Sequence, residues 1–214
     1  MIEEFVGQLR KELASGLPGL EAQMQMAPAR LSDIKRDFKH KEPPRESAVL
    51  ILFYEAQGKI HFPLMVRPIY PGVHSGQISF PGGKFELTDY NLEETALRET
   101  EEEIGIPREQ VKVVGQLSAH YIPPSNFNIE PYIGYLKEKP VFVKDEKEVD
   151  EVLEVRLDDL LDENLRKSKL IRPYQGVEIK APYFDIQDKV VWGATAMILS
   201  ELIEVIKQTP YIHE

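Results

Sequence analysis

Hydrophobic residues run without interruption from residue 48 to residue 54, which is the pattern of a buried β-strand. Gln57 and Gly58 then supply a turn signal, and residues 60–66 return as a second, mostly apolar segment. The pattern of apolar positions therefore predicts a hairpin made of these two strands.

An amphipathic helix is predicted ahead of this hairpin. Its apolar side chains recur on one face, and Gly16 and Pro18 end it. The residues of that face are Ile2, Phe5, Val6, Leu9 and Leu13. We expect the face to pack against the domain or against a partner subunit, which a homodimer would supply. Residues 15–47 show no comparable period and are predicted to be irregular.

A second helix is predicted between Asn91 and Gly105. Asn91 is a favourable N-cap, Glu94 stands three residues later as in a capping box, and Gly105 followed by Pro107 is a stop signal. At about 100° per residue, one arc of this helix gathers the side chains expected to face the core. These are Leu92, Ala96, Leu97, Thr100 and Ile104.

The rest of the chain predicts further strands and a last helix. The predicted elements are strands at residues 111–117, 129–136 and 148–157, a loop at 118–128, a short helix at 158–161, and a hairpin of 175–179 with 181–186. The last helix opens at residues 192–196, and its apolar stripe is Ala196, Leu199, Leu202, Ile203 and Ile206.

Composition excludes several classes of function. The 214 residues, of which 42% are hydrophobic, suit one buried domain. The longest apolar run is too short to cross a bilayer, and the acidic start lacks the apolar core of a leader, so we expect a cytoplasmic protein without a membrane partner. The chain has no cysteine for disulfide or thiol chemistry. A net charge of −10 without a basic stripe argues against a nucleic-acid partner.

Glu99, Glu102 and Glu103 form an acidic arc beside the core face of the second predicted helix. Glu99 lies one turn from the other two, and like charges at these spacings destabilise a helix by about 0.2–0.5 kcal/mol per pair. A divalent cation that prefers oxygen ligands, Mg²⁺ or Mn²⁺, would remove this repulsion. Arg98 is placed to hold Glu102 one turn later. The alternative is a solvated Glu-rich helix that binds nothing.

The residues around this helix resemble the box of the Nudix hydrolases. That box runs Gly, five residues, Glu, seven residues, Arg-Glu-apolar-x-Glu-Glu-x-Gly-apolar. This chain gives Gly83, five residues, Asp89, eight residues and then a matching run at residues 98–106. It departs from the box in three ways: Asp89 stands for the usual Glu, Thr100 for an apolar residue, and the loop is one residue longer.

These departures resemble the coenzyme A pyrophosphatase branch of the family, whose box carries Asp and a Thr-Ala-Leu-Arg-Glu run such as residues 95–99. An upstream signature of that branch also matches this chain, at Arg67, Gly76, Phe80, Pro81, Gly82 and Gly83. The chain departs from that signature at Met65, Pro68 and Gly72. Gly72 replaces an Arg, so one expected anion contact is lost.

The resemblance implies a fold and a division of the chain. The fold class is α/β, namely the Nudix fold, an α/β/α sandwich around a mixed β-sheet, here with an extra N-terminal helix. Residues 1–45 would hold that helix and a connecting segment, and residues 46–214 the Nudix hydrolase domain.

The resemblance also implies roles for the residues of the box. Glu99 and Glu103 are the expected metal ligands, and Glu102 is a third ligand or the catalytic base. Arg98 is expected to position the catalytic carboxylates, and a backbone carbonyl at Gly83 to complete the coordination of Mg²⁺ or Mn²⁺.

Residues outside the box are expected to complete the site. Arg67 and Lys84 would bind substrate phosphates, and Glu148 or Glu151 would act as base or extra ligand. For each of these two glutamates, a solvated carboxylate at a strand edge is the alternative.

The implied reaction is metal-dependent hydrolysis of the diphosphate bond of a nucleoside diphosphate derivative, a small-molecule nucleotide substrate. The branch implies coenzyme A or acyl-coenzyme A, giving 3′,5′-ADP and (acyl-)4′-phosphopantetheine. ADP-ribose or a sugar nucleotide is the alternative that Gly72 favours. A nucleotide-sensing protein without catalysis is a further alternative, which the retained carboxylates disfavour.

Overall fold

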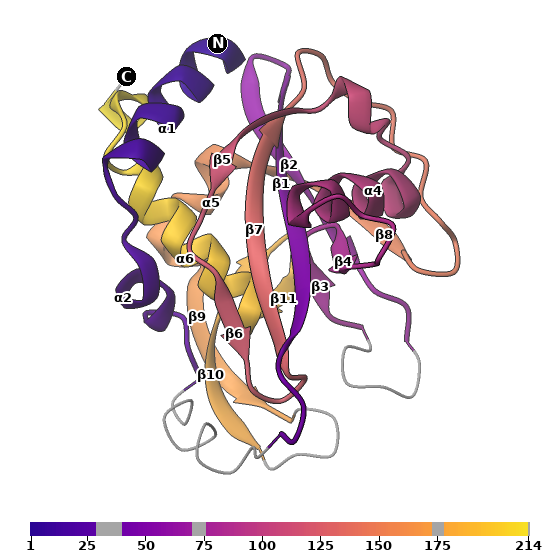
Figure 1. Ribbon diagram of the computed structural model, residues 1–214. Helices are drawn as coiled ribbons and strands as arrows, with labels where there is room; N and C mark the ends of the chain where they lie inside the picture. The colour runs from indigo at the N-terminus through magenta and orange to yellow at the C-terminus, as the bar shows by residue number, and fades with distance from the viewer. Residues whose placement is uncertain (29–39, 70–75, 173–177, 214) are drawn as a thin grey trace.

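A mixed β-sheet forms the centre of the molecule (Figure 1). The computed structural model describes residues 1–28, 40–69, 76–172 and 178–213. Within these residues the sheet has the strand order β3-β2-β1-β7-β5, while β4, β6 and β8 pair with β1, β7 and β2 respectively. The bounds are Arg45–Ala56 (β1), Lys59–Val66 (β2), Ile78–Ser79 (β3), Gly82–Lys84 (β4), Lys112–Gln116 (β5), His120–Ile122 (β6), Phe127–Tyr135 (β7) and Glu151–Arg156 (β8).

The predicted hairpin is confirmed as β1 and β2, which pair antiparallel. Gln57 and Gly58 turn the chain between them with φ angles of 53° and 68°. Two consecutive left-handed residues give a turn whose twist matches that of the strands beside it. β1 also pairs with β7, in parallel, and this pairing makes the sheet mixed.

Helices cover both faces of this sheet (Figure 1). Side chains of β1 alternate between the faces, as the two-residue period of a strand requires. Leu50 and Leu52 belong to the core beneath α4, whereas Ile51 and Phe53 belong to the core shared with α1 and α6. The predicted α/β/α sandwich with an extra N-terminal helix is therefore confirmed. The α-helices are α1 (Ile2–Ser15), α2 (Gly19–Met24), α4 (Leu92–Ile104), α5 (Leu157–Leu160) and α6 (Ala194–Ile206).

A second, antiparallel sheet has the strand order β11-β10-β9. Its strands are β9 (Arg166–Ile171), β10 (Ile179–Ile186) and β11 (Lys189–Trp192). The predicted hairpin of residues 175–179 with 181–186 is wrong, because residues 179–186 form one strand whose hairpin partner is β11. Gln187 and Asp188 make the turn, with φ angles of 52° and 61°. Residues 175–177 lie outside the described residues.

Two short elements lie where the sequence pattern predicts irregular chain. α2 falls within residues 15–47, and β6 falls within the loop predicted at 118–128. The strand predicted from residue 148 begins instead at Glu151. α2 and β6 each span less than two full periods of the hydrophobic pattern, so the pattern could not indicate them. Residues 29–39 of the first segment lie outside the described residues.

α1 packs against the sheet through the face predicted from its spacing. Phe5 has 1% of its side chain exposed and lies edge-on to Phe53, with 5.1 Å between ring centroids. Its ring also contacts Tyr211 beyond α6, at 5.0 Å. The apolar face of α1 therefore packs against the domain, which is the first of the two arrangements expected from the sequence.

Replacing Phe5 by Ala should lower the free energy of unfolding by about 3–5 kcal/mol, because it leaves a cavity between α1, the sheet and the C-terminal segment. Urea unfolding followed by circular dichroism would measure the change. Glu4→Ala, at an exposed position of the same helix, is the matched control and should change it by less than about 0.5 kcal/mol. Equal effects of the two substitutions would contradict the packing of α1 described above.

Candidate active site

The Gly82–Lys84 strand, β4, brings a glycine turn against the start of β1 and the side of α4. Gly82 has φ of 148°, and a Cβ built there would lie 2.3 Å from the Ala48 carbonyl oxygen. At Gly83 a Cβ would lie 2.4 Å from the carboxylate of Glu99, so this side chain would have to move away from the turn. Both glycines are therefore needed for the close approach of the turn to the sheet and to the helix.

The predicted ends of α4 are confirmed. The Asn91 side chain accepts a hydrogen bond from the Glu94 amide at 2.8 Å, as an N-cap does. Gly105 ends the helix in the left-handed conformation with φ of 72°. Thr100 and Ile104 of the predicted core face are fully buried. These caps fix the rotation of the helix, and with it the direction of its glutamates.

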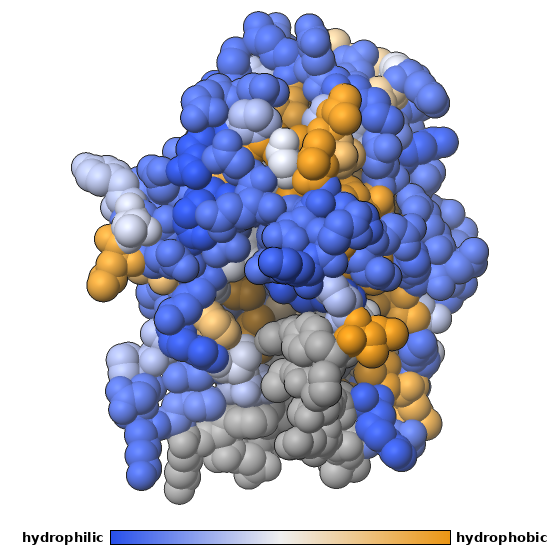
Figure 2. Space-filling model, turned by 90° about the vertical axis from the view of Figure 1, so that its right-hand side faces the viewer, coloured by the Kyte–Doolittle hydropathy of each residue, from blue (hydrophilic) through white to orange (hydrophobic). Residues whose placement is uncertain are grey.

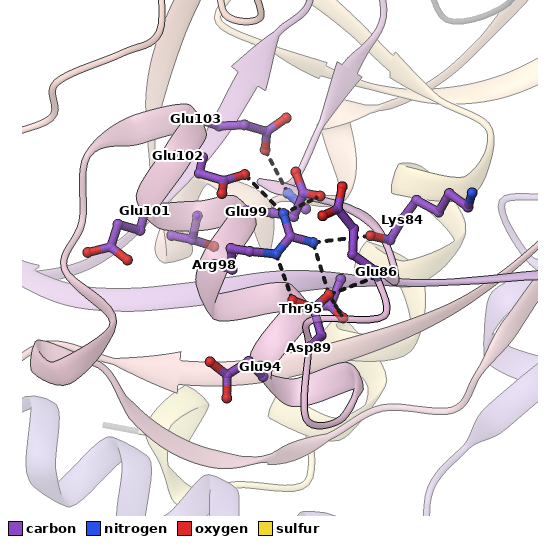
Figure 3. Close-up of polar contacts among 12 residues, drawn as sticks. Lys84, Glu86, Asp89, Glu94, Thr95, Arg98, Glu99, Glu101, Glu102 and Glu103 are labelled. Atoms are coloured by element: carbon purple, nitrogen blue, oxygen red, sulfur yellow. Dashed lines mark hydrogen bonds and ion pairs between the residues drawn. The ribbon is translucent and has the colours of Figure 1, made fainter.

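Arg98 joins the loop before α4 to the glutamates on the helix (Figure 3). Its Nε and Nη2 atoms donate to the two oxygens of Asp89 at 2.7 and 3.0 Å, and Nη2 also donates to the Lys84 carbonyl at 3.2 Å. Nη1 donates to Glu99 at 3.0 Å and to Glu102 at 2.9 Å. All five N–H donors of the guanidinium are thus engaged.

Asp89 is the buried partner in this network. The Arg98 guanidinium holds the pKa of its carboxyl well below its usual range, helped by hydrogen bonds from the Glu86 amide and the Thr95 hydroxyl. Asp89 accordingly keeps its charge across the physiological range and fixes the guanidinium in turn. The shorter carboxylate of Asp89, in place of the usual Glu, suits the close bidentate contact seen here.

Glu103 is the most deeply buried carboxylate of the site, with 1% exposure. One oxygen accepts a hydrogen bond from the Gly82 amide at 2.8 Å, and the other lies 3.6 Å from Nη2 of Arg67. Burial nevertheless dominates and raises the pKa of Glu103 to about 8, with the charges of Glu99 and Glu148 adding to the shift. Burial likewise raises the pKa of Glu99.

A loop after β7 borders the site beside the C-terminal end of α4. The Val143 amide donates to the Ile104 carbonyl at 3.0 Å, and the Asp145 amide to the Glu103 carbonyl at 2.9 Å. These two bonds fasten the loop to the end of the helix and place Glu148 at the site. Glu151, the other predicted base, pairs with Lys189 at 2.8 Å and does not line the site.

These elements enclose a cleft of about 440 Å³, hereafter the acidic cleft. Eight of the nine predicted site residues line it: Arg67, Gly83, Lys84, Arg98, Glu99, Glu102, Glu103 and Glu148. Sequence reasoning missed two further carboxylates that line it: Glu86, at an unspecified position of the box between Gly83 and Asp89, and Asp145, which belongs to no motif. Six carboxylates face three cationic side chains in this lining, so its formal charge is −3 when all are ionised.

The carboxylates of the cleft do not converge on a single point. Among the described residues, no three Asp, Glu or His side chains stand close enough to hold a metal ion as placed. Glu102 is 57% exposed and held outward by Arg98, which also binds Glu99. Glu99 and Glu103 remain directed at the Gly82–Gly83 turn (Figure 3).

A second cavity of about 410 Å³ adjoins the acidic cleft and shares four residues with it, Arg67, Gly82, Gly83 and Lys84. Its remaining lining is mostly apolar and comes from β1, β3, β6, β7, β10, β11, α6 and the loops beside them. We call it the apolar pocket. Sequence reasoning did not predict this pocket, because its lining is assembled from elements that are far apart along the chain.

Comparison with known proteins identifies the family. The sequence profile of the NUDIX domain matches residues 44–174, more than half of the chain. The chain belongs to the Nudix hydrolase family. Nudix hydrolase 15, mitochondrial, of Arabidopsis thaliana is 32% identical over 187 residues, which cover 84% of this chain and 65% of the relative. The uncharacterized Nudix hydrolase NudL of Pectobacterium atrosepticum is 35% identical over 142 residues, covering 64% and 70%.

A solved structure shares the fold of this Nudix protein. The MutT/nudix family protein from Enterococcus faecalis superposes with a TM-score of 0.54 at 18% identity, covering 87% of this chain and 72% of the other. The chain spans about two thirds of the length of the two relatives named above. No helix in the described ranges is long and apolar enough to cross a membrane.

The raised pKa of Glu103 predicts how pH affects the metal-free protein. The pKa of Glu103 is higher in the folded than in the unfolded state, so the folded state binds the proton more tightly. The free energy of unfolding therefore contains a favourable contribution at low pH that is lost as pH rises towards 8. In EDTA, the stability of the wild type relative to Glu103→Gln should fall by up to about 1.4 kcal/mol per pH unit between about pH 5 and pH 8.

Urea unfolding of both proteins across this range measures the difference. Gln keeps an acceptor for the Gly82 amide and does not titrate, so the comparison isolates the carboxyl group. A stability difference that does not vary with pH would show that Glu103 is not buried as described.

Proposed function

We propose that this protein hydrolyses the diphosphate bond of a nucleoside diphosphate derivative with the help of a divalent metal ion. The observation that carries the proposal is the gathering of the box carboxylates beside the Gly82–Gly83 turn, with Arg67 and Lys84 at the same cleft. Such a cleft brings together the negative charge that holds cations and the positive charge that holds phosphate oxygens.

The residues present fit Mg²⁺ or Mn²⁺, on which Nudix hydrolases generally depend. Carboxylate oxygens are the ligands these ions prefer, and an excess of negative charge in the cleft favours their binding. Glu99 and Glu103 would hold the metal together with the Gly83 carbonyl, and Glu102 would join them on release from Arg98. The ion supplies charge neutralisation and an activated water.

The protein's own groups would complete the catalytic arrangement. Arg98 acts as a positioning residue, since its bonds to Asp89 fix the direction in which it holds Glu99 and Glu102. Glu148, in the loop fastened to the end of α4, would accept a proton from the attacking water. Arg67 is anchored at a strand end beside Glu103 and would bind a phosphate oxygen.

The resemblance to the coenzyme A pyrophosphatase branch supports coenzyme A or an acyl-coenzyme A as the substrate. Products would then be 3′,5′-ADP and (acyl-)4′-phosphopantetheine. ADP-ribose and sugar nucleotides remain the alternative, and Gly72, which favoured them, lies outside the described residues. A sensor without catalysis is disfavoured by the intact carboxylates of α4. The cytoplasmic location and the homodimer stay predictions.

Glu103→Gln should reduce kcat by about a hundredfold or more with Mg²⁺ or Mn²⁺, since it removes a buried charge from the reaction centre. Glu101→Gln is the matched control, because Glu101 lies on the same helix but points away to Arg108 at 2.7 Å. Mass spectrometry of products from coenzyme A, acetyl-coenzyme A, ADP-ribose and a sugar nucleotide would identify the bond cleaved.

Preferential formation of 3′,5′-ADP and phosphopantetheine supports the coenzyme A substrate, and preferential cleavage of another diphosphate would replace it. Equal activity of Glu103→Gln and Glu101→Gln would overturn the proposed role of the cleft. Nucleotide binding without any hydrolysis by the wild type would favour the sensor.

A further inference from the structure

The apolar pocket opens directly onto the residues proposed to bind phosphate. It shares Arg67 and Lys84 with the acidic cleft, as well as the two glycines between them. A group attached to a phosphate in the cleft therefore has a short path into the pocket. The part of a substrate that would enter the apolar pocket is the group bonded directly to the diphosphate, rather than a group at the far end of the substrate.

The pocket wall is largely aliphatic and belongs in part to segments beyond the matched NUDIX region of residues 44–174. Its apolar side chains include Ile78 (β3), Ile122 (β6), Ile129 (β7) and, past residue 174, Met197 (α6). Among the described residues of the lining, only Arg67 and Lys84, at the shared end, carry Asp, Glu, Arg or Lys charge. The interior therefore suits an uncharged, largely aliphatic group.

The Ser and Thr hydroxyls of the lining are either hydrogen-bonded to the backbone or buried. Thr195 and Ser47 already donate to backbone carbonyls, at 2.9 and 3.0 Å. The hydroxyl oxygens of Ser79 and Ser125 are buried and have no hydrogen-bond partner among the described residues. Because these two oxygens are buried, they do not face the open volume of the pocket, and the apolar side chains form most of the surface that meets an occupant.

The size of the pocket limits the occupant. At roughly 30 Å³ for each water-sized group, about 410 Å³ holds on the order of a dozen non-hydrogen atoms. A nucleobase also fits this volume, and Tyr121, Phe127 and Trp192 lie at the wall. One face of Phe127 is already covered, however, by the Arg45 guanidinium at 4.0 Å. The aliphatic lining matches a branched aliphatic chain better than the polar edge of a purine.

We propose that the apolar pocket binds the branched aliphatic amide arm that coenzyme A carries on its diphosphate, the pantetheine arm. This inference rests on the proposed function, because it assigns the two halves of that substrate to two cavities. The dimethyl group and first amide nearest the phosphate occupy the pocket, and the nucleotide half stays outside it. The pocket thus selects substrates whose diphosphate bears an aliphatic amide rather than a second sugar or base.

Binding of the arm without its phosphates tests the inference separately from catalysis. Ligand-observed NMR would measure the binding of pantetheine, and of adenosine as comparison, to the wild type in EDTA. Ile122→Trp adds an indole at a half-buried position of the pocket, and Leu170→Trp adds the same group on β9, where Leu170 is 65% exposed. Pantetheine should bind the wild type and Leu170→Trp equally and Ile122→Trp at least tenfold more weakly.

Several results would overturn the inference. One is that pantetheine does not bind the wild type, and another is that Ile122→Trp binds pantetheine as tightly as the wild type does. A third is that adenosine binds the wild type and Ile122→Trp abolishes this binding, which would assign the pocket to a nucleobase. If circular dichroism shows that Ile122→Trp is unfolded, Ile122→Phe takes its place with the same expected direction. Loss of the proposed function has a different signature, namely no hydrolysis of any diphosphate by the metal-loaded wild type.

Discussion

The bidentate contact between Arg98 and Asp89 is the interaction on which the arrangement of the site depends. It joins a loop residue to a helix residue nine positions later, at 2.7 and 3.0 Å, and leaves the other donors of the guanidinium for Glu99, Glu102 and the Lys84 carbonyl. Removing one partner of such a sheltered pair typically costs about 3–5 kcal/mol, because the other charge remains buried. Through its bond to the Lys84 carbonyl, the same guanidinium also joins the strand that carries the two glycines to α4.

The site holds more negative charge than its own cations balance, and this excess is the physical basis of the proposed function. Glu103 is buried so completely that its pKa rises to about 8, which means that the folded protein without a cation favours its protonated form near neutral pH. A divalent cation would compete with that proton, so metal binding and proton release are coupled. The face seen in Figure 2 is predominantly hydrophilic. The apolar pocket, by contrast, is lined in part by core residues of β3 and α6.

Local signals in the sequence predicted the parts of the structure that local chemistry determines. Caps at Asn91 and Gly105 set the ends of α4, and an unbroken apolar run indicated β1. The β9–β11 sheet was not predicted, because β9 is mostly polar and exposed and so shows no alternation of apolar and polar residues. Nothing in the local sequence indicates that β9 pairs with β10. The sequence also did not predict Asp145 as a site residue or the apolar pocket. Both depend on segments that are far apart along the chain, and no single segment carries a motif that indicates them.

The most direct test of this account is to locate Mn²⁺ by anomalous diffraction from crystals of the wild-type protein. The account predicts a peak in the acidic cleft, bound by Glu99 and Glu103 beside Gly83, with the apolar pocket opening from the same end. Crystals that show Mn²⁺ only at other positions, while the enzyme in solution is active with that ion, would contradict the assignment of the cleft as the metal site.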